Sequence, residues 1–163
     1  MRRWRPDDAS DVGAVARLLA DSLVATEREK GVEVASGAAL SATYRREVED
    51  PVAALRGATV LVWTAAGDTP VACAVLTAAT EGWSELKRVW VEPAHRGAGI
   101  AGTMVDEALA IARRRGDRGV RLTVWQWREA AIRLYERSGF APAARWDPRP
   151  GLVCLEREFS TAG

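Results

Sequence analysis

Three closely spaced glycines lie between a strand-like and a helix-like segment, where they could bind a phosphate group. They belong to the run Arg96-Gly97-Ala98-Gly99-Ile100-Ala101-Gly102. The strand-like segment 86–91 precedes the run, Pro93 breaks that strand, and apolar residues at helical spacing predict a helix over 103–115. A helix N-terminus attracts anions, because free backbone N–H groups meet the positive end of the helix dipole there. Glycine allows a positive φ and a close approach of the backbone to phosphate oxygens.

A dinucleotide is one candidate ligand, because Gly97, Gly99 and Gly102 match the Gly-x-Gly-x-x-Gly fingerprint. That fingerprint needs an acidic residue about 20 residues further on, at the end of the next strand, to hold a ribose. The next predicted strand, 120–124, is followed by Trp-Gln-Trp instead. Residues 92–95 also separate the glycines from the preceding strand, whereas a dinucleotide loop follows its strand almost directly. A dinucleotide therefore fits poorly.

A second pattern fits the same run better. Taken as Arg96, Gly99 and Ala101, it resembles Arg/Gln-x-x-Gly-x-Gly/Ala, the pyrophosphate loop of the GCN5-related N-acetyltransferases (GNAT superfamily). The segment 131–140, Ala-Ile-Arg-Leu-Tyr-Glu-Arg-Ser-Gly-Phe, resembles the second signature of that family, a helix ending in Leu-Tyr-Glu and then Gly-Phe opening a strand. One predicted strand separates the two signatures, and the resemblance covers residues 83–142. It implies an N-acetyltransferase that uses acetyl-CoA.

The remaining pattern agrees with the fold of that family. Apolar spacing and turn residues predict the order β-α-α-β-β-β-α-β-α-β-β. Beyond the elements above, we expect a short strand in residues 1–5, a helix capped by Asp7 or Asp8, a polar stretch over 26–37, a helix over 38–49 ended by Pro51, a hairpin of 59–63 and 71–76, a strand over 83–91, a helix over 128–138, and strands over 140–146 and 152–159. The expected fold is α/β (α+β), a central mixed sheet flanked by helices, in a single domain over 1–163.

Composition excludes several classes of protein. The 163 residues are 48% hydrophobic and 28% charged, as in globular proteins, and the net charge of +1 argues against non-specific nucleic-acid binding. No apolar run approaches the 18 residues or so of a membrane span, and the N-terminus lacks the apolar core of a signal peptide. Cys73 and Cys154 are isolated, without metal-ligand spacing, so we expect reduced core cysteines, no metal site and a cytoplasmic protein.

The resemblance implies which residues contact the cofactor. They are Val89, Trp90, Val91, Arg96, Gly97, Ala98, Gly99, Ile100, Ala101, Gly102 and Arg128. The strand residues would act through their backbones, bonding the pantetheine arm like an added strand, with an amide near Val89 as oxyanion donor. Arg128 stands where the family usually has an Asn that bonds the cofactor. Two expectations follow for Arg128: its side chain contacts a phosphate, or it faces solvent.

Two residues are candidates for proton transfer. Tyr135 lies within the Leu-Tyr-Glu motif, and in the resembling enzymes a tyrosine at this place lies near the coenzyme sulfur; its phenol is a donor that stays protonated at neutral pH. The alternative is that Tyr135 only packs the helix against the sheet. Glu85 stands six residues before Val91. In the histone-type members of the family, the glutamate that acts as the base likewise lies six residues before a valine that ends the same strand. Glu81, or ordered water without a single base, is the alternative to Glu85.

The acceptor is expected to be the primary amine of a small molecule, acetylated by direct transfer in a ternary complex. Four tryptophans near strand ends could form an aromatic wall around it: Trp83, Trp125, Trp127 and Trp146. His95, beside the glycine run, is expected to be variable surface. A non-catalytic acyl-CoA-binding module and a protein acetyltransferase, acting on an N-terminus or a lysine, are the alternatives. The oligomeric state is left open, with a homodimer as one option.

Overall fold

A seven-stranded mixed sheet forms the centre of the structure, a computed structural model that describes residues 1–160. The strand order is β1-β2-β3-β4-β5-β7-β6, in which β4 and β5 run parallel and the other neighbours antiparallel. The strands are β1 (Arg2–Arg3), β2 (Thr59–Thr64), β3 (Pro70–Leu76), β4 (Trp83–Val91), β5 (Gly119–Trp125), β6 (Ala141–Pro142) and β7 (Leu152–Glu158). The mixed sheet expected from the sequence is confirmed.

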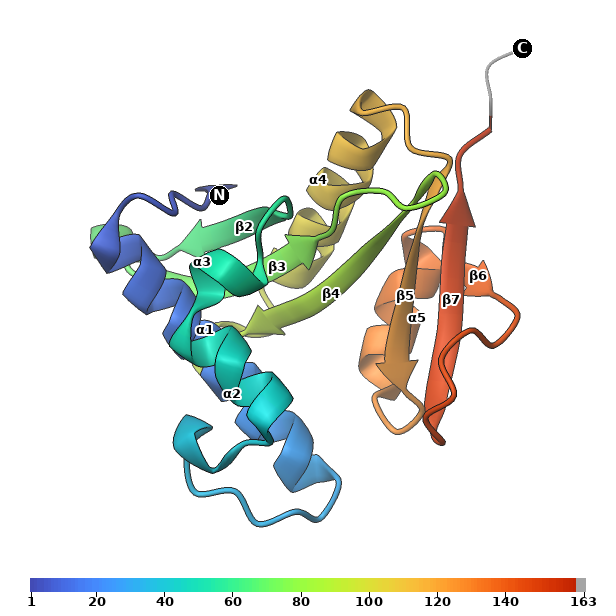
Figure 1. The fold of residues 1–163 in the computed structure, drawn as a ribbon. Helices are drawn as coiled ribbons and strands as arrows, with labels where there is room; N and C mark the ends of the chain where they lie inside the picture. Colours follow the sequence, from blue (N-terminus) through green and yellow to red (C-terminus); the bar gives the residue numbers. More distant parts are fainter. Residues whose placement is uncertain (161–163) are drawn as a thin grey trace.

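Helices cover both faces of this sheet (Figure 1). They are α1 (Ala9–Glu29), α2 (Ala42–Glu49), α3 (Pro51–Ala54), α4 (Ile100–Arg114) and α5 (Glu129–Arg137), with short 3-10 turns at Gly37–Ala39, Ala66–Asp68 and Pro93–His95. We call the face under α1, α2 and α3 the front face, and the face under α4 and α5 the back face. No helix within residues 1–160 is long and apolar enough to cross a membrane.

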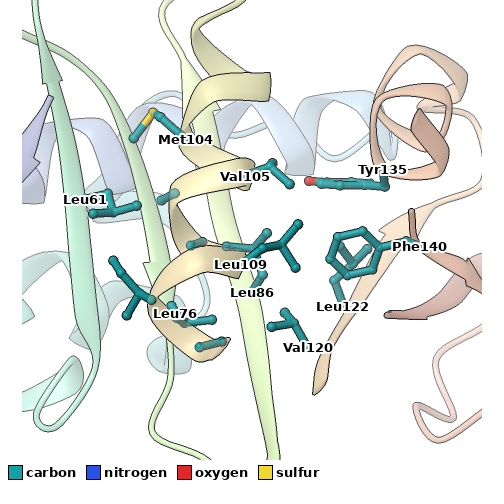
Figure 2. Packing of buried hydrophobic residues seen from close by; sticks show 14 of the residues in the cluster. Leu61, Leu76, Leu86, Met104, Val105, Leu109, Val120, Leu122, Tyr135 and Phe140 are labelled. Carbon is teal, nitrogen blue, oxygen red and sulfur yellow. The ribbon is translucent and has the colours of Figure 1, made fainter. Parts of the chain in front are cut away.

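The two parallel strands separate along their length. The parallel ladder joins Trp83–Glu85 of β4 to Gly119–Arg121 of β5 and goes no further. Figure 1 shows the two strands close at one end and diverging toward their arrowheads. Behind the gap, side chains from β4, β5, α4 and α5 and from Phe140, just after α5, form one buried cluster, which includes Leu86, Val105, Leu122 and Tyr135 (Figure 2). The sheet therefore stays joined through this core while its strands leave an opening.

Several predicted boundaries agree with the structure. Strand β4 spans the predicted residues 83–91, and the hairpin of β2 and β3 turns through Gly67 and Asp68, both at positive φ. Asp8 is the N-cap of α1, since its side chain accepts hydrogen bonds from the backbone N–H groups of Ser10 and Asp11. The predicted order of elements is confirmed, apart from the additional turn α3.

Other boundaries were wrong. Helix α4 begins at Ile100 rather than 103, because Gly99 takes a left-handed conformation, with φ 75°, and starts the helix there. Helix α1 continues to Glu29, into the stretch 26–37 that was expected to be polar and outside the helix. Packing of the apolar face of α1 stabilises the whole helix, so its polar last turn stays helical. The helix predicted over 38–49 is a 3-10 turn followed by α2, and Pro51 opens α3 as well as ending α2. The strand predicted over 140–146 is only β6, which ends at Pro142.

Candidate active site

A cleft of about 610 Å³ lies where β4 and β5 separate. It brings together most of the residues predicted to contact a cofactor: Val89, Trp90, Val91, Arg96, Gly97, Gly99, Ile100, Ala101, Gly102 and Arg128. Tyr135 lines it as well, and so do Glu29, His95 and Arg137. Ala98 and Glu85 are not among the lining residues. One end of the cleft thus meets the start of α4, and its wall continues along α5.

The loop before α4 presents unpaired backbone N–H groups to this cleft. Gly97 and Gly99 have φ angles of 83° and 75°, which side-chain-bearing residues rarely adopt. Thr103 is the first residue of α4 whose N–H bonds back along the chain, to the Gly99 carbonyl at 3.1 Å. Within residues 1–160, the N–H groups of Gly99–Gly102 have no acceptor. A cradle of N–H groups at the positive end of a helix fits the phosphates of a nucleotide cofactor.

Strand β4 presents backbone groups to the same cleft. Glu92 donates its N–H to the Val71 carbonyl at 2.9 Å, and Trp90 lies opposite Cys73 in the same register. Because bonded pairs alternate along an antiparallel ladder, Trp90 bonds toward β3, and the N–H and C=O groups of Val89 and Val91 point to the open side. The Arg96 side chain confirms this direction, since its Nε donates to the Val91 carbonyl at 2.9 Å. An extended ligand arm could therefore bond to Val89 and Val91.

Three arginines surround the cleft. The guanidinium of Arg96 also lies 4.8 Å from the centre of the Trp90 ring, which fixes it against the wall. Arg137 was missed in the sequence, although its spacing from Ala130 and Leu134 puts all three on one face of α5. Arg128 is the third arginine of the lining, and Glu29 is its one carboxylate among the described residues. The net charge of the lining is therefore positive, which favours an anionic ligand.

Arg128 makes contacts that neither sequence expectation included. Its Nε donates to Glu29 at 2.7 Å and its Nη2 to the Thr26 hydroxyl at 2.8 Å. Trp127 adds a hydrogen bond from its indole nitrogen to Glu29 at 3.1 Å. Burial alone would raise the pKa of Glu29, but the hydrogen bonds from Arg128 and Trp127 outweigh it and lower that pKa. Arg128 thus ties the end of α1 to the start of α5 beside the cleft.

Tyr135 lies where α5 meets the back core. Its ring packs edge-on against Phe140, with centroids 5.8 Å apart, and its hydroxyl points toward Val105 of α4 (Figure 2). Burial raises the pKa of Tyr135 to about 12, although Arg128 opposes this shift. The phenol therefore keeps its proton across the neutral range and can act as a hydrogen-bond donor.

The two candidate bases lie at different places on β4. Glu85 is half-buried on the front face, in the last parallel pair before the strands separate, and Arg121 of β5 is its partner in the register. Its backbone N–H donates to the Thr77 hydroxyl at 2.9 Å. Glu81 is exposed in the turn before β4, at φ 52°, at the end of the strand away from the cleft. Of the two, Glu85 lies closer to the point where the strands part.

Arg88 was not singled out in the sequence. It lies in a bulge of β4 with φ 54°, an uncommon conformation for a residue other than glycine. Its Nε and Nη2 donate to the two carboxylate oxygens of Glu47 of α2, at 2.8 Å each, and this pair holds α2 on the front face. The partners are 41 residues apart, so no local pattern indicates the contact.

The tryptophans are only partly placed as predicted. Trp125 and Trp127 stack at the open end of β5, with ring centroids 4.8 Å apart, and Trp146 packs against Arg121. The expectation for Trp83 was wrong. Its ring lies near Gly119 at the opposite, closed end of β4, where the parallel strands still pair.

Comparisons with known proteins decide the family. The sequence profile of the Acetyltransferase (GNAT) family matches residues 21–140. The chain belongs to the GNAT acetyltransferase family. Because members use acetyl-CoA, this GNAT protein is an acetyl-CoA-dependent N-acetyltransferase. A comparison with curated proteins finds no match.

Solved structures share the fold of this GNAT protein. A GNAT-family acetyltransferase of Staphylococcus aureus has a TM-score of 0.72 at 15% identity, over 93% of this chain and 94% of that one. A ribosomal-protein-alanine N-acetyltransferase of Brucella melitensis reaches 0.69 at 19% identity, over 97% and 98%. A Bacillus subtilis acetyltransferase solved with CoA reaches 0.57 at 18% identity, over 69% and 84%. At these identities the likeness shows the fold.

Proposed function

We propose that this enzyme transfers an acetyl group from acetyl-CoA directly to the primary amine of a small molecule, with both substrates bound at once. The observation that carries the proposal is the cradle of unpaired N–H groups at Gly99–Gly102, which opens into the same cleft as Tyr135. Acetyl-CoA supplies the acetyl group as a thioester when it is bound.

Binding is assigned to the loop and to β4. The N–H groups of Gly99–Gly102 and the guanidinium of Arg96 would hold the pyrophosphate, where charge and hydrogen bonds act together. Ala98, in the same loop, would contribute through its backbone. The open-side groups of Val89 and Val91 would bond the pantetheine arm as an added strand does. Arg137 supplies a further cation along α5 for the phosphates.

Proton transfer is assigned to Tyr135 and Glu85. Tyr135 donates its phenolic proton to the departing sulfur, a role supported by its place in the cleft, and its raised pKa of about 12 keeps that proton in place at neutral pH. Glu85 takes the proton of the amine, directly or through water. Its half-buried place at the point where β4 and β5 part supports this role over Glu81. Ordered water without a single base remains the competing mechanism.

Thiol release from acetyl-CoA, measured with a panel of amines, tests the proposal. We expect release that depends on a small primary amine, with the acetylated amine detected as product. If coenzyme binds but no amine in the panel is acetylated, the protein is an acyl-CoA-binding module. If only protein N-termini or lysines are acetylated, the small-molecule assignment is wrong.

A further inference from the structure

Three half-buried charged side chains form a row across the front face of the sheet. Arg121 of β5 is in register with Glu85 of β4 on one side and with Glu156 of β7 on the other. Residues in register on neighbouring strands point to the same face. Each of the three charged residues has a leucine next to it in the chain, and these leucines point into the back core: Leu86, Leu122 and Leu155. Because neighbouring residues of a strand point to opposite faces, the three charges point to the front.

Opposite charges at such positions ordinarily pair, but these do not. Within residues 1–160, neither Arg121 nor Glu85 nor Glu156 has a side-chain hydrogen bond or an ion pair within 4.0 Å. By contrast, Arg118, three residues earlier, bonds Glu158 at 2.9 Å. The Nε atom of Arg121 is buried without any acceptor. A buried donor on a cation that lacks a partner is unfavourable, which suggests that a ligand supplies one.

The surroundings of Arg121 hold its guanidinium in place. It lies 5.5 Å from the centre of the Trp146 ring, which belongs to the connection between β6 and β7. Stacking on an aromatic face leaves the edge of a guanidinium free for planar anions such as a carboxylate. The row therefore offers one cationic position flanked by two anionic ones, at the spacing of neighbouring strands, about 4.8 Å.

We propose that the acceptor is an amino acid, with its carboxylate on Arg121 and its amine toward Glu85. This inference rests on the proposed transfer to a small-molecule amine and names the class of that amine. An amino acid carries both charges on one carbon, so it can meet adjacent positions of the row at once. In the transfer, the amine nitrogen bonds to the acetyl carbon as the carbon–sulfur bond breaks. The ammonium first gives one proton to Glu85, so that the nitrogen attacks as a neutral amine. The nitrogen loses a second proton as the amide forms, and this proton replaces, through solvent, the one that Tyr135 gives to the sulfur.

A substrate panel on the unaltered enzyme gives the first test. The panel holds amino acids, the matching amino acid amides, the matching alkylamines without a carboxyl group, and short peptides. We expect kcat/KM for the amino acids to exceed that for the other three groups by about tenfold to a hundredfold, the value of a hydrogen bond to a charged group. Equal rates with amides or peptides would overturn the inference and leave the proposed function standing. No acetylation of any amine would refute both.

Arg121→Gln gives the second test. We expect the preference for amino acids over their amides to fall close to one, while the affinity for acetyl-CoA stays unchanged. Arg118→Gln is the matched control. Arg118 immediately precedes β5, and its guanidinium also lies over a tryptophan ring, 5.4 Å from the centre of Trp83. It should keep the preference. A preference that survives Arg121→Gln would overturn the inference. Should Arg121→Gln fail to fold, Arg121→Lys keeps the charge, and the substrate panel decides without any variant.

Discussion

The proposed mechanism depends on a single hydroxyl group, that of Tyr135. Burial raises its pKa to about 12, so the phenol stays protonated across the neutral range. Tyr135→Phe removes that proton and leaves the ring, so the packing on Phe140 persists. We expect turnover to fall by about a hundredfold, the usual contribution of a general acid.

Equilibrium binding of acetyl-CoA to the Tyr135→Phe variant serves as the control and should match that of the parent. Equal turnover would mean that the thiolate departs unaided. A fall in coenzyme affinity that accounts for the whole loss would reduce Tyr135 to a packing residue.

Residue types alone made part of this site predictable. Gly97 and Gly99 could be found in the sequence because few other residues adopt a positive φ, and Tyr135 because it stands within a helix motif. Arg128 could not be assigned, since its partner Glu29 is 99 residues away and only the fold brings them together. The same is true of Arg121, whose significance lies in the register of three strands.

At the scale of elements, the contact between Arg128 and Glu29 joins α1 to α5 beside the cleft. Both side chains are partly exposed, so the coupling free energy should be modest, about 0.5–1 kcal/mol. A double-mutant cycle with Glu29→Gln and Arg128→Gln, read by urea unfolding, measures it. The exposed pair Arg133 and Glu129 within α5 is the control and should give less.

This coupling should depend on pH in one direction. The folded-state pKa of Glu29 is lowered, so its contribution to stability is present above the pKa of the unfolded chain, about 4.3, and is lost as the pH falls through the folded value. A coupling that is absent at neutral pH, or that grows on acidification, would mean that the two helices are not tied by this pair.

Elements were predictable wherever local signals were strong. Strand β4 and the cap of α1 follow from the sequence, because alternation and an Asp N-cap are local features. The start of α4 was placed three residues late, since the pattern of apolar residues does not show where the backbone enters the helix. The bulge at Arg88 is held by Glu47 of another element, and no run of residues around it indicates that contact.

In the molecule as a whole, the separation of β4 from β5 creates the cleft that is the candidate active site, and the back core keeps the two halves together. The single domain over 1–163 stays a prediction, and residues 161–163 lie outside the part of the chain that the structure describes. The proposed acceptor side could not be predicted in detail, because its charges come from β4, β5 and β7 and its Trp146 from the connection before β7. Those parts meet only in the folded chain.

The central claim is that acetyl-CoA binds on the N–H groups at the start of α4, and calorimetry of Gly99→Val tests it most directly. A β-branched side chain at φ 75° is strained and would stand where phosphate must approach. Gly57→Val is the matched control, because Gly57 has φ 78° and equally open surroundings away from the cleft. We predict that acetyl-CoA binds the parent and Gly57→Val alike and that Gly99→Val, still folded by circular dichroism, does not bind it. Unchanged affinity in Gly99→Val would contradict the account.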